Sequence, residues 1–436
     1  MRNHFITPNA DDCASTIIFK PALPQTILKP DYSASSFLTL APYGTGKTLL
    51  RCEYYKSLRS NNYFKVLILN EEIDEYLQRF VNAKATSETD CDKESCIIKW
   101  SSDEFGQLLL SLLVTQFVNT FEKESLDLSD ISLDEKIELI TIMCYYYNEQ
   151  GVSKLEKFVN SFLDKTGNSM YRASAAVGLI KLNNNVYTDT SLFSHLQNDL
   201  KKLTALRQDD EKLLLLLAIV EGEWFQIKAL QTTPSNNVLN DLSNFALFIK
   251  KHVKKTAVFI IDGVNENRFF FKENNINRKS LELFCRSSLS QEIIAMVMAH
   301  NFYLSIFYPK IDGINMADGI IRKDKFPILE INWNLQSIIN YADYVLQEMN
   351  KNASASRCKS FVDFKTLVNY SNPKNAEIIN RISTPRILHY FMQHLITEMN
   401  HYANVVKEPF IATTENIYTA YEKAAKSTFK VHFINK

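Results

Sequence analysis

Five short apolar runs along the chain predict the strands of a sheet. The runs are Ser36–Leu40, Phe64–Leu69, Ala257–Ile261, Tyr303–Phe307 and Pro327–Ile331. Each has the length of a strand and is bounded by polar residues, proline or glycine. The third run, A-V-F-I-I, is apolar at every position, which is typical of a strand buried on both faces. The pattern therefore predicts a central parallel sheet.

Segments with helical spacing separate these strands. Directly after the first strand, a glycine-containing loop leads into T-L-L-R-C-E-Y-Y-K-S-L, and strand, loop, helix and strand together predict a right-handed βαβ unit. Capping-box patterns and apolar spacing predict a helical insertion between the second and third strands. Its expected helices are Asp103–Phe121, Asp134–Tyr147, Ser153–Leu163, Leu192–Leu203, Asp210–Val220 and Leu239–Val253.

The chain after Asn334 is expected to be helical. The segments are Leu335–Asn350, a helix that begins at Pro385, and Thr414–Ala425. A length of 436 residues exceeds one typical core and predicts two or three structural units. The expected division is an N-terminal segment with the first part of the α/β core, the helical insertion, the second part of the core and a C-terminal helical domain. Their bounds are 1–100, 101–253, 254–333 and 334–436.

The charge balance of the chain bears on which kinds of partner it is expected to bind. Lysine plus arginine and aspartate plus glutamate both number 49, so the formal net charge is zero. A neutral chain gives no support for a general nucleic-acid-binding surface, although a local basic groove stays open. The seven cysteines lack zinc-site spacing, so reduced thiols in a cytoplasmic protein are expected. No apolar stretch reaches the length of a membrane-spanning helix, and no membrane segment is expected.

The loop A-P-Y-G-T-G-K-T, residues 41–48, carries the clearest chemistry and is called the glycine loop below. Its glycines allow backbone N–H groups to face phosphate oxygens, Lys47 suits the β- and γ-phosphates, and Thr48 suits Mg²⁺. Ala41 stands where the strict pattern has glycine. The alternative is a glycine-containing turn that occurs by chance and binds no nucleotide. The predicted nucleotide-binding residues are Tyr43, Gly44, Thr45, Gly46, Lys47, Thr48 and Leu49.

A second candidate is the acidic stretch I-I-D-G-V-N-E, which ends the third predicted strand. Asp262 is expected to end a strand beside that of the glycine loop, where its carboxylate would bind Mg²⁺ together with Thr48. Glu266, or a water held by Asn265, would position the attacking water. A polar turn that closes a core strand is the alternative.

These motifs resemble those of a known family. A-P-Y-G-T-G-K-T resembles the G-P-x-G-T-G-K-T loop of AAA+ ATPases, and I-I-D-G-V-N-E resembles the h-h-D-G-x-D-E motif of their STAND and NACHT relatives, with Asn265 replacing the second acid. S-T-P-R-I-L-H-Y-F resembles the start of a helix in the AAA+ lid, where Arg386 would be the sensor 2 residue; the alternative is a plain helix start at Pro385. The segment from Phe326 to Ile339 resembles the last strand and lid start of KAP and STAND ATPases.

The resemblance covers residues 36–85 and 255–425. It implies an α/β fold, namely a P-loop AAA+-like parallel sheet core with a large helical insertion and a C-terminal helical lid. It also implies a Mg²⁺-dependent ATPase that binds ATP, with Asp262, Glu266 and Arg386 as catalytic residues. The expected role is a conformational or assembly switch in bacterial antiviral defence, with a protein partner or effector. The resemblance is also compatible with a homo-oligomer. The alternatives are a DNA-binding AAA+ ATPase of replication or transposition and a nucleotide-binding scaffold without hydrolysis.

Position in the same architecture suggests further roles. Asn70 ends the second strand, where a polar residue restrains the catalytic glutamate in AAA+ proteins. Lys310 is expected as the sensor 1 residue, with Asn301 as a rival. Arg322 is a candidate arginine finger for a neighbouring subunit. Each also fits an ordinary turn or a solvated basic residue.

Overall fold

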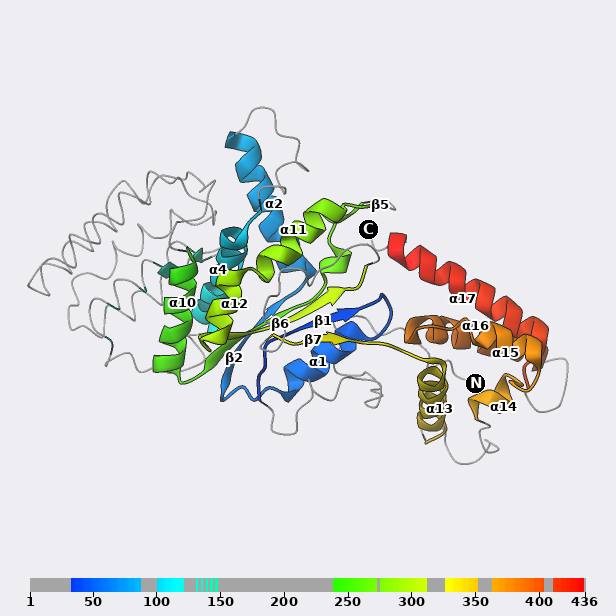
Figure 1. Cartoon of the computed structure of the whole chain (residues 1–436). Coiled ribbons are helices and arrows are strands. Elements are labelled where there is room, and N and C mark those ends of the chain that lie inside the picture. Colours follow the sequence, from blue (N-terminus) through cyan, green and yellow to red (C-terminus); the bar gives the residue numbers. More distant parts are fainter. Residues whose placement is uncertain are drawn as a thin grey trace, which may run out of the picture.

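The structure is a computed structural model, which describes residues 33–87, 100–120, 238–272, 275–311, 326–351, 363–403 and 411–434 and isolated positions between 131 and 147. At its centre lies a five-stranded sheet in the order β2-β3-β6-β1-β7, parallel throughout (Figure 1). The strands are β1 Phe37–Ala41, β2 Tyr63–Ile68, β3 Thr256–Ile261, β6 Phe302–Pro309 and β7 Ile328–Glu330. The predicted parallel sheet is thus confirmed, with strand bounds shifted by at most two residues.

Alternate residues of β3 enter two separate cores, as the two-residue period of a strand requires. Phe259 and Ile261 pack in one core, whereas Val258 and Ile260 pack in the other. The first core is covered by α2 (Asn70–Ser87), α4 (Ser102–Thr120), α10 (Val238–Phe248), α11 (Arg278–Ser288) and α12 (Gln291–Met298). The second is covered by α1 (Lys47–Ser57). The core is therefore a three-layer α/β/α arrangement (Figure 1).

The predicted helical insertion is described at its two ends. α4 and α10 agree with the predicted helices Asp103–Phe121 and Leu239–Val253, and a π-helical turn, Ile249–Val253, follows α10. Both helices share the first core with the sheet, so these ends of the insertion pack as part of the α/β core. The other predicted helices of this region lie outside the described residues, apart from isolated positions of the second one.

Several elements were not expected from the sequence, namely α2, α11, α12 and the hairpin of β4 (Phe271–Lys272) and β5 (Asn275–Ile276). Side-chain caps begin two of the helices: Asn277 accepts the Ser280 N–H and Ser290 accepts the Ile293 N–H. The apolar stretch that starts at Ile293 contains the end of one element and the start of another. α12 ends before His300, which has φ 56°, and β6 begins two residues after His300.

The C-terminal helices form a unit with its own apolar core, called the C-terminal helical unit below. It lies beside the sheet in Figure 1. Its helices are α13 Leu335–Lys351, α14 Phe364–Leu367, α15 Pro373–Ile379, α16 Pro385–Ala403 and α17 Thr414–Ile434. The helical character predicted after Asn334 is confirmed, and the last helix extends nine residues beyond the predicted end.

The cysteines differ from the expectation of reduced thiols. Cys52 on α1 is disulfide-bonded, whereas Cys285 is free and buried. Cysteine spacing did not reveal this bond, because pairing depends on which segments the fold brings together. For membranes, none of the helices within the described ranges has both the length and the apolar character needed to cross a bilayer.

Candidate functional site

The candidate residues gather where the parallel strands end. Asn70 follows β2, Asp262 follows β3, Lys310 follows β6, and the glycine loop follows β1. In open parallel sheets, ligands bind outside the carboxyl ends of the strands. One expectation is wrong: β6 lies between β3 and β1, so Asp262 does not end a neighbour of the β1 strand. Chain order alone does not determine lateral order.

The glycine loop makes two left-handed turns before α1. Gly44 has φ 80° and Gly46 has φ 92°, a region that residues with a Cβ adopt only with strain. Gly46 is also the N-cap of α1. Between them, the Thr45 hydroxyl donates to the carbonyl of Pro42 at 2.7 Å, which closes the loop. Lys47, Thr48 and Leu49 therefore form the first turn of a helix at the edge of the sheet.

A buried cluster of three charges lies beneath the loop. Lys47 Nζ is 3.2 Å from Asp262 Oδ1, and Arg51 Nε is 3.3 Å from Asp262 Oδ2. These side chains are 9%, 4% and 4% exposed for Lys47, Asp262 and Arg51, so water screens the cluster weakly. Two cations and one carboxylate leave one net positive charge, which favours binding of an anion.

Arg51 was missed by sequence reasoning. A signal was present, because Arg51 lies four residues after Lys47 and therefore on the same face of α1. An arginine on a helix face that points toward the sheet needs a buried acid. Asp262 is that acid.

The C-terminal helical unit contacts the glycine loop through Arg386, at the start of α16, and Trp333, which precedes α13, does so as well. The Arg386 backbone N–H donates to the carbonyl of Gly44 at 3.2 Å, and the Arg386 guanidinium lies 4.2 Å from the centre of the Tyr43 ring. Trp333 Nε1 donates to the carbonyl of Thr45 at 2.9 Å. A Cβ at position 44 would be 2.7 Å from the Arg386 Cβ, so this approach requires glycine. The structure thus brings Arg386 to the loop.

Glu266 lies at the exposed end of a short 3₁₀ turn, Val264–Glu266, directly after the buried Asp262. The charge of Glu266 affects Tyr43 of the glycine loop. Burial raises the pKa of Tyr43, the charge of Arg386 lowers it, and the charge of Glu266 raises it further. Glu266 and Arg386 therefore act on the same phenol from different elements. The side chain of Asn265 lies outside the described part of the structure.

Asn70 does lie beside this turn, where its candidate role requires it. Its side-chain Oδ1 accepts a hydrogen bond from Nδ2 of Asn267 at 3.2 Å. Asn267 is the residue after Glu266 and is fully buried. Asn70 was expected to restrain Glu266. The hydrogen bond described for it goes instead to Asn267, the residue next to Glu266.

The remaining candidates are placed as follows. The Lys310 N–H donates to the carbonyl of Ala41 at 2.9 Å, and its ammonium pairs with Glu330 at 2.9 Å. The hydrogen bond from Lys310 lowers the pKa of Glu330. Asn301 precedes β6 and donates to Ser243 Oγ at 2.7 Å, at the opposite end of the strand from the site, so its sensor 1 role is wrong. Arg322 lies outside the described residues.

Three packed rings connect the loop to the interior of the helical unit. The Trp333 ring centre is 5.6 Å from that of Tyr341, and the Tyr341 hydroxyl is 2.7 Å from Nε2 of His389. Burial lowers the pKa of His389 to about 4, and the charge of Arg386 adds to the effect. His389 is therefore a neutral hydrogen-bonding residue near neutral pH.

Acid should destabilise the helical unit through His389. The folded pKa of about 4 lies below the ordinary value of 6.5, so the unfolded chain takes up the proton first and stability falls as pH falls through this interval. From pH 7 to pH 5 the loss is about 2 kcal/mol. Urea unfolding at both pH values should show a smaller loss for His389→Gln than for wild type. Equal losses would contradict this origin.

Comparison of the chain with protein-family models, curated proteins and solved structures finds no match. The interpretation of the site therefore rests on its geometry. Within the ranges that the structure describes, there is no cluster of three or more His, Cys, Asp or Glu side chains arranged for a metal.

Proposed function

We propose that the chain is a Mg²⁺-dependent P-loop ATPase of AAA+/STAND type. One observation carries the proposal: Lys47 of the glycine loop lies 3.2 Å from Asp262, at the carboxyl edge of a parallel sheet and the start of α1. A loop lysine for phosphates and a strand-end carboxylate for Mg²⁺ are the two parts shared by P-loop NTPases. These residues come from distant parts of the sequence, which makes a chance turn a poor explanation.

Phosphate binding would use the start of α1. The first backbone N–H groups of a helix have no partners within it, and the helix dipole adds positive potential there. With the positive charge of the buried cluster, this end of α1 suits a triphosphate. Lys47 would exchange its contact with Asp262 for the phosphates. Arg51 would then remain as the buried partner of the Asp262 carboxylate.

The residues present fit Mg²⁺ as it binds in nucleotide sites. Mg²⁺ commonly takes one or two carboxylates, keeps several waters and completes its shell with substrate phosphates. Asp262 and the Thr48 hydroxyl would hold it, which agrees with the absence of a larger acidic cluster within the described residues. When bound, the ion neutralises charge that develops on the phosphates.

Glu266 would position the attacking water and accept its proton. It is exposed at the same edge of the sheet and acts electrostatically on Tyr43 of the loop. A general base must reach the proton that it removes, so proximity to the phosphate end of the loop is the relevant property. Asp262 is buried in contact with two cations, so it is placed to hold the metal rather than the attacking water.

The C-terminal helical unit would act as a lid. Arg386 and Trp333 contact the carbonyls of Gly44 and Thr45, so nucleotide in the loop would change the contacts that hold the unit. ATP binding and hydrolysis would then move the helices, as in other gated sites. By analogy with STAND ATPases, the motion would signal to a protein partner or drive assembly in bacterial defence.

The proposal is tested by ATP binding to a Lys47→Ala variant. Loss of a buried charge that meets the phosphates should weaken ATP affinity by at least about 30-fold. Calorimetric titration with Mg²⁺ and ATP measures this directly. Lys423→Ala is the matched control, since it removes a lysine paired with Glu398 in the helical unit. Wild-type affinity in Lys47→Ala would refute the P-loop interpretation, and binding without turnover in wild type would favour a scaffold.

A further inference from the structure

The turn that carries Glu266 is pressed against the start of α2. A Cβ at position 263 would lie 2.7 Å from the backbone nitrogen of Asn70. Gly263 also has φ 85°, so both space and backbone conformation require glycine here. Gly263, which follows Asp262, is therefore in direct contact with Asn70, the first residue of α2.

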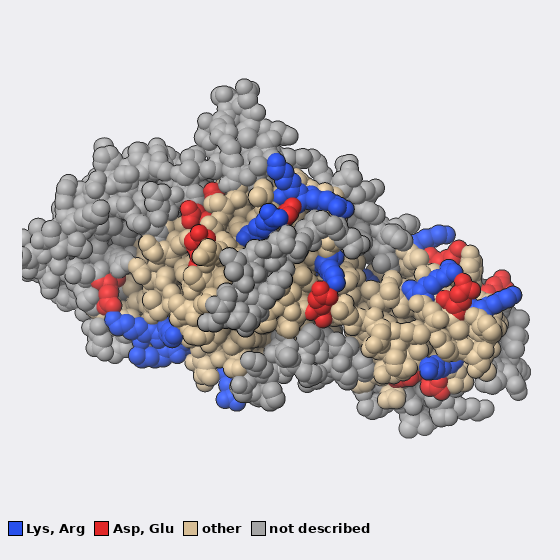
Figure 2. Space-filling model, viewed as in Figure 1, with Lys and Arg blue, Asp and Glu red and all other residues tan. Residues whose placement is uncertain are grey.

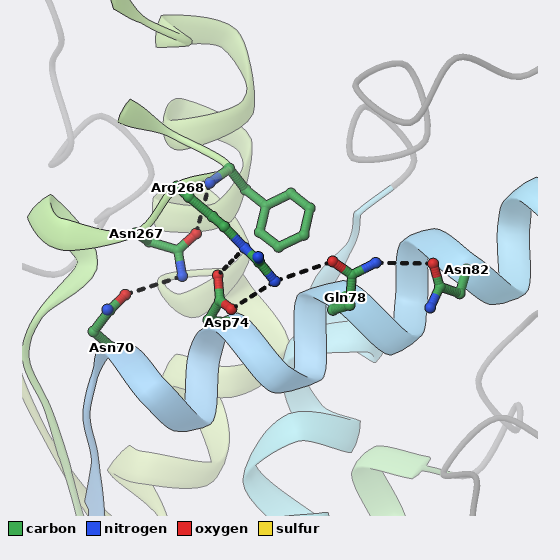
Figure 3. A network of polar contacts seen from close by, with 7 residues as sticks. Asn70, Asp74, Gln78, Asn82, Asn267 and Arg268 are labelled. Atoms are coloured by element: carbon green, nitrogen blue, oxygen red, sulfur yellow. Dashed lines mark hydrogen bonds and ion pairs between the residues drawn. The ribbon is translucent and has the colours of Figure 1, made fainter. Parts of the chain in front are cut away.

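Asn267 ties the other end of the turn to the same residue (Figure 3). It is 0% exposed. Its Nδ2 donates to Asn70 Oδ1 at 3.2 Å, and its Oδ1 accepts the backbone N–H of Phe269 at 3.0 Å. Both polar atoms of one buried amide are thus bonded, which fixes its orientation. The peptide immediately after Glu266 is held in place.

Arg268 adds a second connection, one turn further along α2. Its Nε donates to Asp74 Oδ1 at 2.9 Å, and its Nη2 lies 2.9 Å from Asp74 Oδ2. The same Nη2 donates to Gln78 at 3.1 Å. Figure 3 shows the guanidinium reaching two successive turns of the helix. A two-pronged contact of this kind restricts orientation more than a single ion pair does.

Resting on the ATPase proposed above, we propose that Asn267 and Arg268 are positioning residues for Glu266, which fix its turn to α2. Within the turn itself, the Glu266 N–H donates to the carbonyl of Gly263 at 2.9 Å and the Asn267 N–H to that of Val264 at 3.3 Å, and Val264 packs in the first core. A general base acts only within hydrogen-bond reach. A misplacement of about 1 Å can slow a reaction about 100-fold.

Removal of the exposed connection tests the proposal without loss of the core. The Arg268 and Asp74 side chains are 59% and 26% exposed. Arg268→Ala and Asp74→Ala should each lower kcat for ATP about five- to tenfold, with KM and ATP affinity nearly unchanged, and the double variant should be no slower than either. Arg381→Ala breaks an ion pair with Glu377 at the end of α15, in which the arginine is equally exposed at 59%, and its kcat should equal that of wild type.

Hydrogen exchange of residues 263–268 tests the same proposal without turnover. Exchange should be faster in Arg268→Ala and in Asn267→Ala than in wild type, and unchanged in Arg381→Ala. Unchanged exchange in both turn variants overturns the anchoring, and faster exchange with full kcat overturns the positioning role. A wild-type chain without ATP turnover overturns the proposed function instead, while hydrogen exchange still decides the anchoring.

Discussion

A Glu266→Gln variant should bind ATP as wild type does and hydrolyse it about 100- to 10,000-fold more slowly. The amide keeps the size and the exposed position of the side chain at the end of the 3₁₀ turn. It cannot accept the proton of the attacking water. Binding should survive because the phosphate-binding groups belong to α1 and the glycine loop, which the substitution leaves intact.

Steady-state phosphate release and calorimetric ATP titration separate the two effects. Glu292→Gln is the matched control, because Glu292 is an exposed residue in the first turn of α12. Turnover should be lost only in Glu266→Gln. If this variant hydrolyses ATP at the wild-type rate, Glu266 is not the general base, although the nucleotide site itself stays open to test.

The strands could be located from the sequence because their apolar runs are short and sharply bounded. β3 is buried at five consecutive positions, and a run of that kind has the length of a strand rather than a helix. Lateral order was not predictable in the same way. The Leu304 N–H donates to Ser36 across 268 residues of chain, and no local pattern encodes which strands meet over such a separation.

Some residues of the candidate site could likewise be predicted from the sequence, and others could not. Lys47, Asp262 and Arg386 stand at boundaries between elements, where the residue type and the order of motifs carry information. Arg51 acts from inside α1 and Asn267 from the end of the 3₁₀ turn, and their importance comes from burial. Asn267 meets Asn70 across 197 residues, so only the assembled fold shows that its amide has a partner.

α2 shows the limit of local pattern. Asn70, Glu71 and Glu72 were expected to follow the end of a strand, with an ordinary turn as the alternative for Asn70, yet they begin an 18-residue helix. Acidic residues in a first helical turn are favourable because of the helix dipole. Glu72 also accepts the N–H of Leu69 at 2.9 Å, a side-chain cap of the helix start. The same residues therefore suit a turn and a helix, and tertiary contacts decide between the two.

The largest effect on stability is expected for Asp262→Ala. The substitution leaves Lys47 and Arg51 buried without the carboxylate that both contact. Two buried cations that lose their shared carboxylate repel each other, so the free energy of unfolding of the α/β core should fall by about 3–5 kcal/mol. Urea unfolding followed by far-UV circular dichroism measures this loss.

Two comparisons identify the cause of that loss. Glu330→Ala removes the acid of an exposed pair, with Lys310 at 2.9 Å and both side chains more than 40% exposed, and should cost less than about 1 kcal/mol. Asp262→Ala combined with Arg51→Met should recover part of the stability, since one of the two buried positive charges is replaced by an apolar side chain of similar length. If Asp262→Ala is no less stable than Glu330→Ala, the three charges do not form the buried cluster on which the phosphate site depends.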